Sequence, residues 1–196
     1  MKILVACEYS GKVRDAFIKA GNKNTWSCDI LPSESEYSQQ HYQDTIESVL
    51  TKDPHWDLMV CHPPCTHLAV SGARWFKDKK VEQEEALELV RYLLGQDQIK
   101  HIALENPVSI ISSRIRKASQ YIQPWQFGHG ETKKTGLWLK NLPLLEPTNI
   151  VEGRSNRMHM MPGGKNQAKK RSLTYDGIAE AMASQWLTYI RENNNE

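Results

Sequence analysis

The chain contains the stretch Asp57-Leu-Met-Val-Cys61-His-Pro-Pro-Cys65, in which a short apolar run leads into two prolines and a cysteine. Further along, a second apolar run ends in a similar way at Leu104-Glu105-Asn-Pro107. Short apolar runs bounded by turn residues are typical of buried strands. Proline ends such a strand because it cannot donate a hydrogen bond to the strand ladder. The two runs therefore predict two buried strands, each followed by a reactive side chain.

The alternation of apolar runs and helical patterns continues along the whole chain. The runs predicted to be strands are Lys2–Cys7, Thr25–Cys28, Leu58–Cys61, Ile99–Leu104 and Thr135–Leu142. The segments predicted to be helical are Val13–Ala20, Ile46–Leu50, Val81–Leu94, Arg114–Tyr121 and Ile178–Ile190. Continuous apolar strands alternating with helices predict an α/β domain with a mostly parallel sheet flanked by helices.

Polar groups follow four of the predicted strands, at Glu8–Gly11, Asp29, Cys65 and Glu105. In a parallel sheet the functional loops lie beyond the carboxyl ends of the strands, so we expect these residues to share one site. A thiol and a carboxyl placed together suit attack on a ring carbon that becomes electrophilic when a nearby ring nitrogen is protonated. That chemistry suggests a pyrimidine base.

Cys65 has two other interpretations. A cysteine is most often a small buried hydrophobic residue, whereas a nucleophilic cysteine needs an exposed and electropositive setting. The spacing Cys61-His62-x-x-Cys65-x-His67 also permits metal binding. Because no second Cys/His pair appears at zinc-site spacing and the prolines constrain chelation, no metal is expected.

The two acids each have a structural alternative. Glu105 ends an apolar strand, so we expect partial desolvation to raise its pKa and make it a proton donor; a structural hydrogen bond is the other interpretation. Asn106 and Pro107 would fix the turn in either case. Asp29 follows the second strand, where a carboxylate often binds ribose hydroxyls, and the alternative is a helix cap.

Charge is concentrated in one segment rather than in the whole chain. The chain has 25 Lys and Arg against 23 Asp and Glu, a formal net charge of +2, which does not by itself indicate a nucleic-acid partner. Between residues 151 and 175 there is one acid, Glu152, and the bases are Arg154, Arg157, Lys165, Lys169, Lys170 and Arg171. Such a cluster could neutralise phosphates, or it could be a solvated basic loop.

The remaining features predict one cytoplasmic domain spanning residues 1–196. No apolar stretch is long enough to cross a membrane, and Met1–Ala6 lacks a signal-peptide pattern and is predicted to enter the first strand. The four cysteines lie in or beside apolar runs, which is not typical of a disulfide framework.

The order of these motifs resembles that of the DNA cytosine-5 methyltransferases over nearly the whole chain. Pro64-Cys65 matches the family's catalytic Pro-Cys motif, and Glu105-Asn106-Pro107 resembles its Glu-Asn-Val motif. Val5–Gly21 is similar to the Gly-rich first motif, although Gly11 is the sole match to its usual glycines. The resemblance implies a single Rossmann-like methyltransferase domain.

The resemblance also implies a cofactor and a mechanism. S-adenosylmethionine would be the cofactor, with Asp29 on its ribose and Asp44 near its adenine. Cys65 would add to C6 of cytosine while Glu105 protonates or hydrogen-bonds N3, and in a duplex the base would first be flipped out. Further cofactor contacts are expected from Glu8, Tyr9, Ser10, Gly11, Ile30, Pro63 and Gly177.

Two departures from the family bear on the substrate. The Gln-Arg-x-Arg segment of the family resembles Glu131-Thr-Lys133-Lys134-Thr here, so Lys133 and Lys134 are expected to replace its arginines in catalysis. Where the family has a large target-recognition domain, this chain has the irregular basic segment Pro143–Thr174. Residues expected to contact substrate are Pro64, Asn106, Arg154, Arg157, Lys169, Lys170 and Arg171.

These departures leave three hypotheses. The first is a compact methyltransferase, similar to phage-encoded members of the family, that acts on DNA in a bacterial or phage-infected cell, alone or with a separate specificity subunit. The second keeps the cysteine chemistry but modifies a free pyrimidine nucleotide. The third is a non-catalytic protein that binds the cofactor or nucleic acid on the same scaffold.

Overall fold

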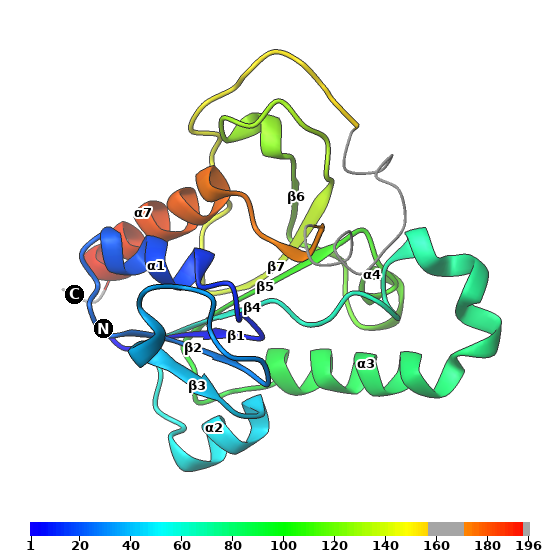
Figure 1. The fold of residues 1–196 in the computed structure, drawn as a ribbon, viewed down its shortest axis with the longest axis horizontal. Helices are drawn as coiled ribbons and strands as arrows, with labels where there is room; N and C mark the ends of the chain where they lie inside the picture. The colour runs from blue at the N-terminus through cyan, green and yellow to red at the C-terminus, as the bar shows by residue number, and fades with distance from the viewer. Residues whose placement is uncertain (157–170, 194–196) are drawn as a thin grey trace.

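A computed structural model of the chain describes residues 1–156 and 171–193. In these residues seven strands form one sheet in the order β3-β2-β1-β4-β5-β7-β6 (Figure 1). The strands are β1 (Ile3–Ala6), β2 (Thr25–Asp29), β3 (His41–Gln43), β4 (Leu58–Cys61), β5 (His101–Pro107), β6 (Gln120–Ile122) and β7 (Thr135–Lys140).

The first five strands are parallel, and the other two reverse direction. β1 pairs in parallel with β2 and β4, β2 with β3, and β4 with β5. β7 is antiparallel to β5, and β6 is antiparallel to β7. The structure thus confirms the mostly parallel α/β sheet and brings the carboxyl ends of β1, β2, β4 and β5 to one edge.

Helices cover both faces of the sheet (Figure 1). On one face lie α1 (Lys12–Lys19) and α7 (Asp176–Asn193), and on the other lie α2 (Ile46–Lys52), α3 (Lys80–Leu94) and α4 (Ile111–Arg114). Three short 3₁₀ helices complete the described elements: η1 (Ser38–Gln40), η2 (Val70–Asp78) and η3 (Pro124–Gln126).

The central strands are apolar throughout because both faces of the sheet are buried. In β1, Ile3 and Val5 face the cluster formed with α1 and α7, while Leu4 and Ala6 face the cluster formed with α2 and α3. All four side chains are 0% exposed. Alternation between two buried faces explains why the strands appear in the sequence as continuous apolar runs.

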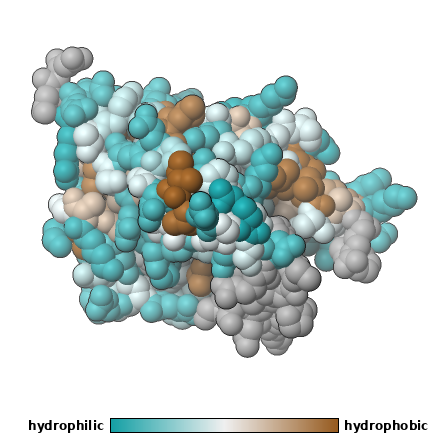
Figure 2. Space-filling view, turned by 90° about the horizontal axis from the view of Figure 1, so that it is seen from above, coloured by the Kyte–Doolittle hydropathy of each residue, from teal (hydrophilic) through white to brown (hydrophobic). Residues whose placement is uncertain are grey.

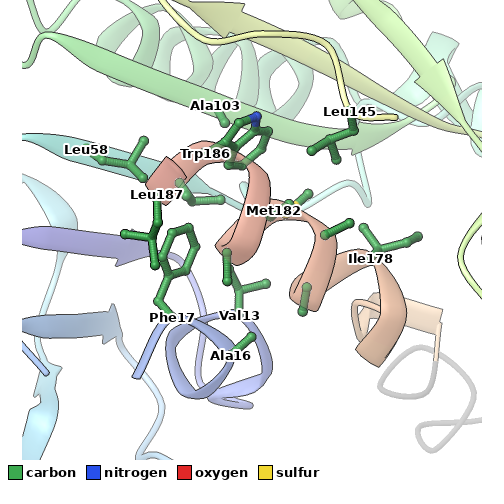
Figure 3. Packing of buried hydrophobic residues seen from close by; sticks show 14 of the residues in the cluster. Val13, Ala16, Phe17, Leu58, Ala103, Leu145, Ile178, Met182, Trp186 and Leu187 are labelled. Atoms are coloured by element: carbon green, nitrogen blue, oxygen red, sulfur yellow. The ribbon is translucent and has the colours of Figure 1, made fainter. Parts of the chain in front are cut away.

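The contact between α1 and α7 joins the two ends of the chain. Figure 3 shows Met182 and Leu187 of α7 close to Val13 and Phe17 of α1. Trp186, also on α7, is fully buried, and its Nε1 donates to the Pro143 carbonyl at 3.2 Å. Burying side chains of this size stabilises a fold by about 1.5–3 kcal/mol each. The last helix therefore belongs to the core that supports β1 and β4.

The helix predicted over Arg114–Tyr121 is wrong. The helical turn α4 ends at Arg114, and the chain then enters the edge strand β6. The Ser119 N–H donates to the Leu137 carbonyl at 2.7 Å, and Tyr121 pairs with Gly136. The backbone of this segment finds its hydrogen-bond partners in β7. Pairing of this kind is a tertiary interaction, and the local sequence pattern does not contain it.

The irregular segment predicted after β7 lies partly within the described residues. Its first part runs beside the segment from η3 to Glu131, through bridges between Phe127 and Asn149 and between Glu131 and Ser155. No helix in the part of the chain that the structure describes is both long and apolar enough to span a membrane.

Candidate active site

A cavity of about 1310 Å³ opens at the carboxyl edge of the sheet. Its walls come from the loops after β1, β2, β4 and β5, from residues 132–134 before β7, and from Arg171 and Ser172. A pocket for one small ligand usually has a volume of roughly 300–1,000 Å³, so this cavity has room for two ligands.

The cavity brings together much of the predicted site. Predicted residues that line it are Tyr9, Asp29, Ile30, Asp44, Pro64, Cys65, Lys133, Lys134 and Arg171. Predicted residues that do not line it are Glu8, Ser10, Gly11, Pro63, Glu105, Asn106, Arg154 and Gly177. Arg157, Lys169 and Lys170 lie outside the described residues.

Cys65 is held by a turn that its neighbours fix. β4 ends at Cys61, and the buried Asn106 at the end of β5 donates its Nδ2 to the Pro63 carbonyl at 3.0 Å. The carbonyl of Cys65 accepts hydrogen bonds from the N–H groups of Leu68 and Ala69, at 3.0 and 2.9 Å. Asn106 thus positions the Pro-Pro turn rather than lining the cavity.

Opposing effects act on the thiol of Cys65. Burial and the nearby Glu105 carboxylate raise its pKa, while Lys133 and Arg171 act in the opposite direction. The thiol is half-buried, so it needs these cations or a base to become a nucleophilic thiolate. Both cations belong to segments distant from Cys65 in the sequence.

Glu105 is buried beneath His62. The Nδ1 of His62 donates to Oε2 of Glu105 at 2.9 Å, and each of the two side chains is 10% exposed. Burial by itself would raise the pKa of Glu105, but the hydrogen bond from His62 and the charges of Lys133 and His62 lower it below its ordinary value. The expectation of a raised pKa at Glu105 is therefore wrong, because the sequence pattern does not show its histidine partner.

His62 shows the complementary effect and lines the cavity. Burial lowers its pKa, but Glu105, and to a smaller extent Glu8, raise it above the ordinary histidine value. Its neighbour Cys61, the last residue of β4, is buried in the core between the sheet and the helices α2 and α3, and it does not line the cavity. Among the described residues no three His, Cys, Asp or Glu side chains are placed to share a metal ion.

The turn after β1 is closed by its own side chains. Glu8 is buried, and its carboxylate accepts from the N–H groups of Val13 and Arg14 at 2.6 and 3.2 Å. The Lys12 N–H donates to the Ser10 hydroxyl at 3.3 Å. The side chains of Glu8 and Ser10 thus occupy the N–H groups of Lys12, Val13 and Arg14 at the start of α1.

Gly11 is required by the backbone of that turn. Its φ of 75° lies in the left-handed region, and a Cβ there would lie 2.5 Å from Cβ of Ser35. Glycine is therefore needed at this position both for the positive φ of the turn and for the close contact with the loop that follows β2.

The two predicted cofactor acids differ in availability. Asp29 is partly buried, which raises its pKa despite hydrogen bonds from the backbone, including one from the Leu31 N–H to Oδ1 at 2.9 Å. Asp44 is half-buried, and hydrogen bonds from Lys52, Ser48 and the Thr45 N–H lower its pKa to about 2. Both acids line the cavity, but both oxygens of Asp44 already have hydrogen-bond partners.

An apolar wall lies beside Asp29. Ile30 is 69% exposed, Leu31 is 48% exposed, and both line the cavity. Elsewhere exposed apolar groups are scattered, and on the face that Figure 2 shows they form separate patches among hydrophilic residues. An exposed apolar surface next to a carboxylate is a suitable binding surface for a nucleoside.

The basic residues Lys133, Lys134 and Arg154 of the predicted site differ in their surroundings. The Nζ of Lys133 donates to the Leu173 carbonyl at 3.0 Å, and the Nζ of Lys134 lies 4.7 Å from the centre of the Tyr121 ring. Arg154 stacks on Trp125, at 4.0 Å from the ring centre, and is not part of the cavity wall.

The structure gives Gly177 a packing role. A Cβ at this position would lie 1.9 Å from the Phe127 carbonyl oxygen. The Gly177 N–H donates to Nε2 of His129 at 3.1 Å. The start of α7 is thus pressed against the segment that follows η3, away from the cavity wall.

Two of the cavity residues that were not among the predicted site residues carry titratable groups beside Cys65 or Asp29. Cys7 lines the cavity with a φ of 58°, and burial, aided by Asp29, raises the pKa of its thiol to about 12. His62 is the other, and its position directly after a buried strand is the signal that could have identified it. Its carboxylate partner comes from another strand and is visible only in the fold.

Comparisons with known proteins support the fold. No family model and no curated protein matches the chain. A solved structure from E. coli, described as a DNA modification methyltransferase encoded within a prophage, matches at 12% identity with a TM-score of 0.51. The match covers 78% of this chain and 52% of that one, so the chain spans about half the length of this neighbour. The likeness shows a shared Rossmann-like α/β fold.

Proposed function

We propose that this protein is an S-adenosylmethionine-dependent methyltransferase that acts on C5 of cytosine in DNA through a covalent adduct with Cys65. The observation that carries the proposal is that Cys65 and the His62–Glu105 pair meet at one cavity, beside Asp29 and an apolar wall. A nucleophile, an acid pair and a nucleoside-binding surface are the groups that this reaction requires.

The residues around the first helix fit a cationic cofactor better than a dinucleotide. A pyrophosphate would need the free N–H groups at the N-terminus of α1, and the carboxylate of Glu8 already holds them. S-adenosylmethionine has no phosphate, and it would supply an electrophilic methyl group on a sulfonium. Asp29 would accept hydrogen bonds from its ribose hydroxyls, and Ile30 and Leu31 would contact its base.

The chain's own residues account for the chemistry at the pyrimidine ring. The Sγ of Cys65 would form a bond to C6, and the electron pair of the C5–C6 double bond would make C5 nucleophilic. The His62–Glu105 pair would supply the hydrogen bond or proton at N3 that makes C6 open to attack. After substitution at C5, the C5 proton would pass to water, the electron pair of that C–H bond would re-form the C5–C6 double bond, and Sγ would leave C6 as the thiolate, which restores the aromatic ring.

DNA is the proposed substrate because three cations form part of the cavity wall. Lys133, Lys134 and Arg171 line it and could contact phosphates on either side of a flipped base. The solved neighbour is itself described as a DNA modification methyltransferase. The cavity volume is sufficient for a cofactor and a flipped nucleotide together.

Methyl transfer from labelled S-adenosylmethionine tests the proposal. The protein would be incubated with duplex DNA, single-stranded DNA, RNA and dCMP, and cofactor binding would be measured by calorimetry. We expect incorporation into DNA, abolished by Cys65→Ser and retained by Cys61→Ala, which removes a core thiol. Transfer to dCMP alone would identify a nucleotide-modifying enzyme, and cofactor binding without transfer would indicate a non-catalytic protein.

A fluorinated substrate tests the covalent step separately. With 5-fluorocytosine in the DNA, the ring has no proton at C5 to lose, so the adduct should persist. We expect a denaturation-resistant complex between protein and DNA that maps to Cys65 by mass spectrometry. Methyl transfer without any trapped complex would contradict the covalent mechanism.

A further inference from the structure

His62 forms part of the cavity wall and hydrogen-bonds to Glu105, which does not. Its side chain lines the cavity, whereas Glu105 is 8% exposed and is not part of the cavity wall. Nδ1 of His62 donates a hydrogen bond to Oε2 of Glu105 at 2.9 Å. Nε2 of His62 is buried and has no hydrogen-bond partner within the described structure.

His62 is the one residue with an unpartnered buried side-chain atom, among those described, that also lines the cavity, so a ligand in the cavity could supply the missing partner. Buried polar atoms of folded proteins are almost always paired, because an unmade hydrogen bond costs the desolvation of that atom. The imidazole is otherwise well held, since Glu105 fixes its orientation from the opposite side. The pair therefore has the arrangement of an acid or base oriented by a carboxylate behind it.

The charges around His62 favour the imidazolium. Glu105 on β5 and Glu8 after β1 both stabilise the positive ring, and Lys133 before β7 opposes them. In the imidazolium both ring nitrogens are donors, so Nε2, which has no partner within the described structure, would have a hydrogen to donate to a ligand that reaches it. Glu105 is anionic in this pair and has no proton to give.

We infer that His62 is the catalytic residue that donates its Nε2 hydrogen to N3 of the target cytosine, and that Glu105 is a positioning residue behind it. This inference rests on the proposed function. As Cys65 Sγ bonds to C6, the hydrogen moves from Nε2 to N3. When the bond between C6 and Sγ breaks, the hydrogen returns to Nε2, so the pair is unchanged after each turnover.

The same contact would help to select the base. N3 of cytosine carries a lone pair and accepts a hydrogen bond, whereas N3 of thymine and uracil carries a hydrogen. A donor at Nε2 would therefore pair with cytosine and oppose the other two pyrimidines. Specificity of this kind is strong because a mismatch leaves buried donors facing each other.

The pH dependence of methyl transfer separates His62 from Glu105. The wild-type turnover number should fall on the alkaline side as His62 loses its proton. In His62→Gln, which has an amide and does not titrate in this range, we expect a loss of roughly 100-fold or more and no alkaline fall from this group. In Glu105→Gln the fall should move to lower pH, because a stabilising negative charge has been removed.

Matched controls keep the inference open to refutation. His67→Gln changes a histidine in the same loop that is not in the cavity wall, and its activity should match the wild type. Cofactor binding and thermal unfolding would verify the fold of each variant, with His62→Asn as a second substitution. Activity of His62→Gln within a few-fold of wild type, or reduced activity of Glu105→Gln with no shift of the pH profile, would overturn the inference. A wild-type protein inactive on every substrate would instead refute the proposed function itself.

Discussion

At the scale of single residues, opposing effects act on the pKa of the Cys65 thiol. Burial and Glu105 disfavour the thiolate, and Lys133 and Arg171 favour it. Lys133 is held in place by the Leu173 carbonyl, so its charge stays near the cavity. The neighbouring Lys134 lies over the Tyr121 ring and is not among the groups that perturb Cys65.

Removal of the Lys133 charge should slow the reaction of Cys65 with iodoacetamide. Lys133 lowers the pKa of the thiol, so Lys133→Ala should raise it and reduce the thiolate fraction at any pH below that value. We expect a roughly threefold slower alkylation near neutral pH, because rate follows thiolate fraction. Peptide mapping by mass spectrometry would separate Cys65 from Cys7, whose pKa of about 12 keeps it protonated.

The adjacent lysine supplies the control for this measurement. Lys134→Ala removes the same charge one residue away, and we expect the alkylation rate of Cys65 to remain at the wild-type value. Equal slowing by both variants would mean that general surface charge, rather than the position of Lys133, sets the reactivity of the thiol.

At the scale of elements, the ends of the first and last helices are fixed by close contacts. Glu8 caps α1, and the first turn of α7 presses on the Phe127 carbonyl through Gly177. A glycine at this point lets the helix approach a backbone carbonyl to a distance that no side chain would allow. This contact holds the segment after η3 against α7.

Gly177→Ala should destabilise the protein because its Cβ would lie 1.9 Å from the Phe127 carbonyl oxygen. Overpacking against backbone typically costs about 1–3 kcal/mol, and the free energy of unfolding in denaturant would measure it. As a control, the added Cβ in Gly72→Ala would have its nearest neighbour, the Thr66 carbonyl oxygen, at 3.7 Å, so little change is expected. Wild-type stability in Gly177→Ala would show that α7 can shift at no cost.

The elements also show how far the sequence could predict the fold and the site. β4 has the predicted bounds, Leu58–Cys61, because a strand buried on both faces leaves an unbroken apolar run. The edge strands β3 and β6 were not predicted, since they are short and depend on a partner strand. The candidate site could likewise be predicted only where a local pattern was enough. The position of Cys65 after a buried strand could be predicted, whereas the pairing of Glu105 with His62 could not, because it joins two strands.

At the scale of the whole molecule, the chain is nearly neutral, with a net charge of +2, and its cavity carries charges of both signs. The acids Asp29, Glu34, Asp44 and Glu47 come from the end of β2 and the segment that leads into α2, whereas Lys133, Lys134 and Arg171 come from the later part of the chain. Cations on one part of the cavity edge can hold a polyanion there without making the protein bind polyanions over its whole surface. Binding to DNA should therefore depend on salt and on these residues in particular.

Lys134→Gln should weaken DNA binding equally for all sequences. If Lys134 contacts one phosphate, its loss removes one released counterion, so the slope of log affinity against log salt should become shallower by about 1. Lys100→Gln, at the opposite end of β5 from the cavity, is the matched control and should leave the slope unchanged. Fluorescence anisotropy with random-sequence duplexes at several salt concentrations would measure both slopes. An unchanged slope in Lys134→Gln would exclude this lysine from the DNA interface, and equal changes in both variants would mean that the charge of the whole molecule, not the cavity edge, determines binding.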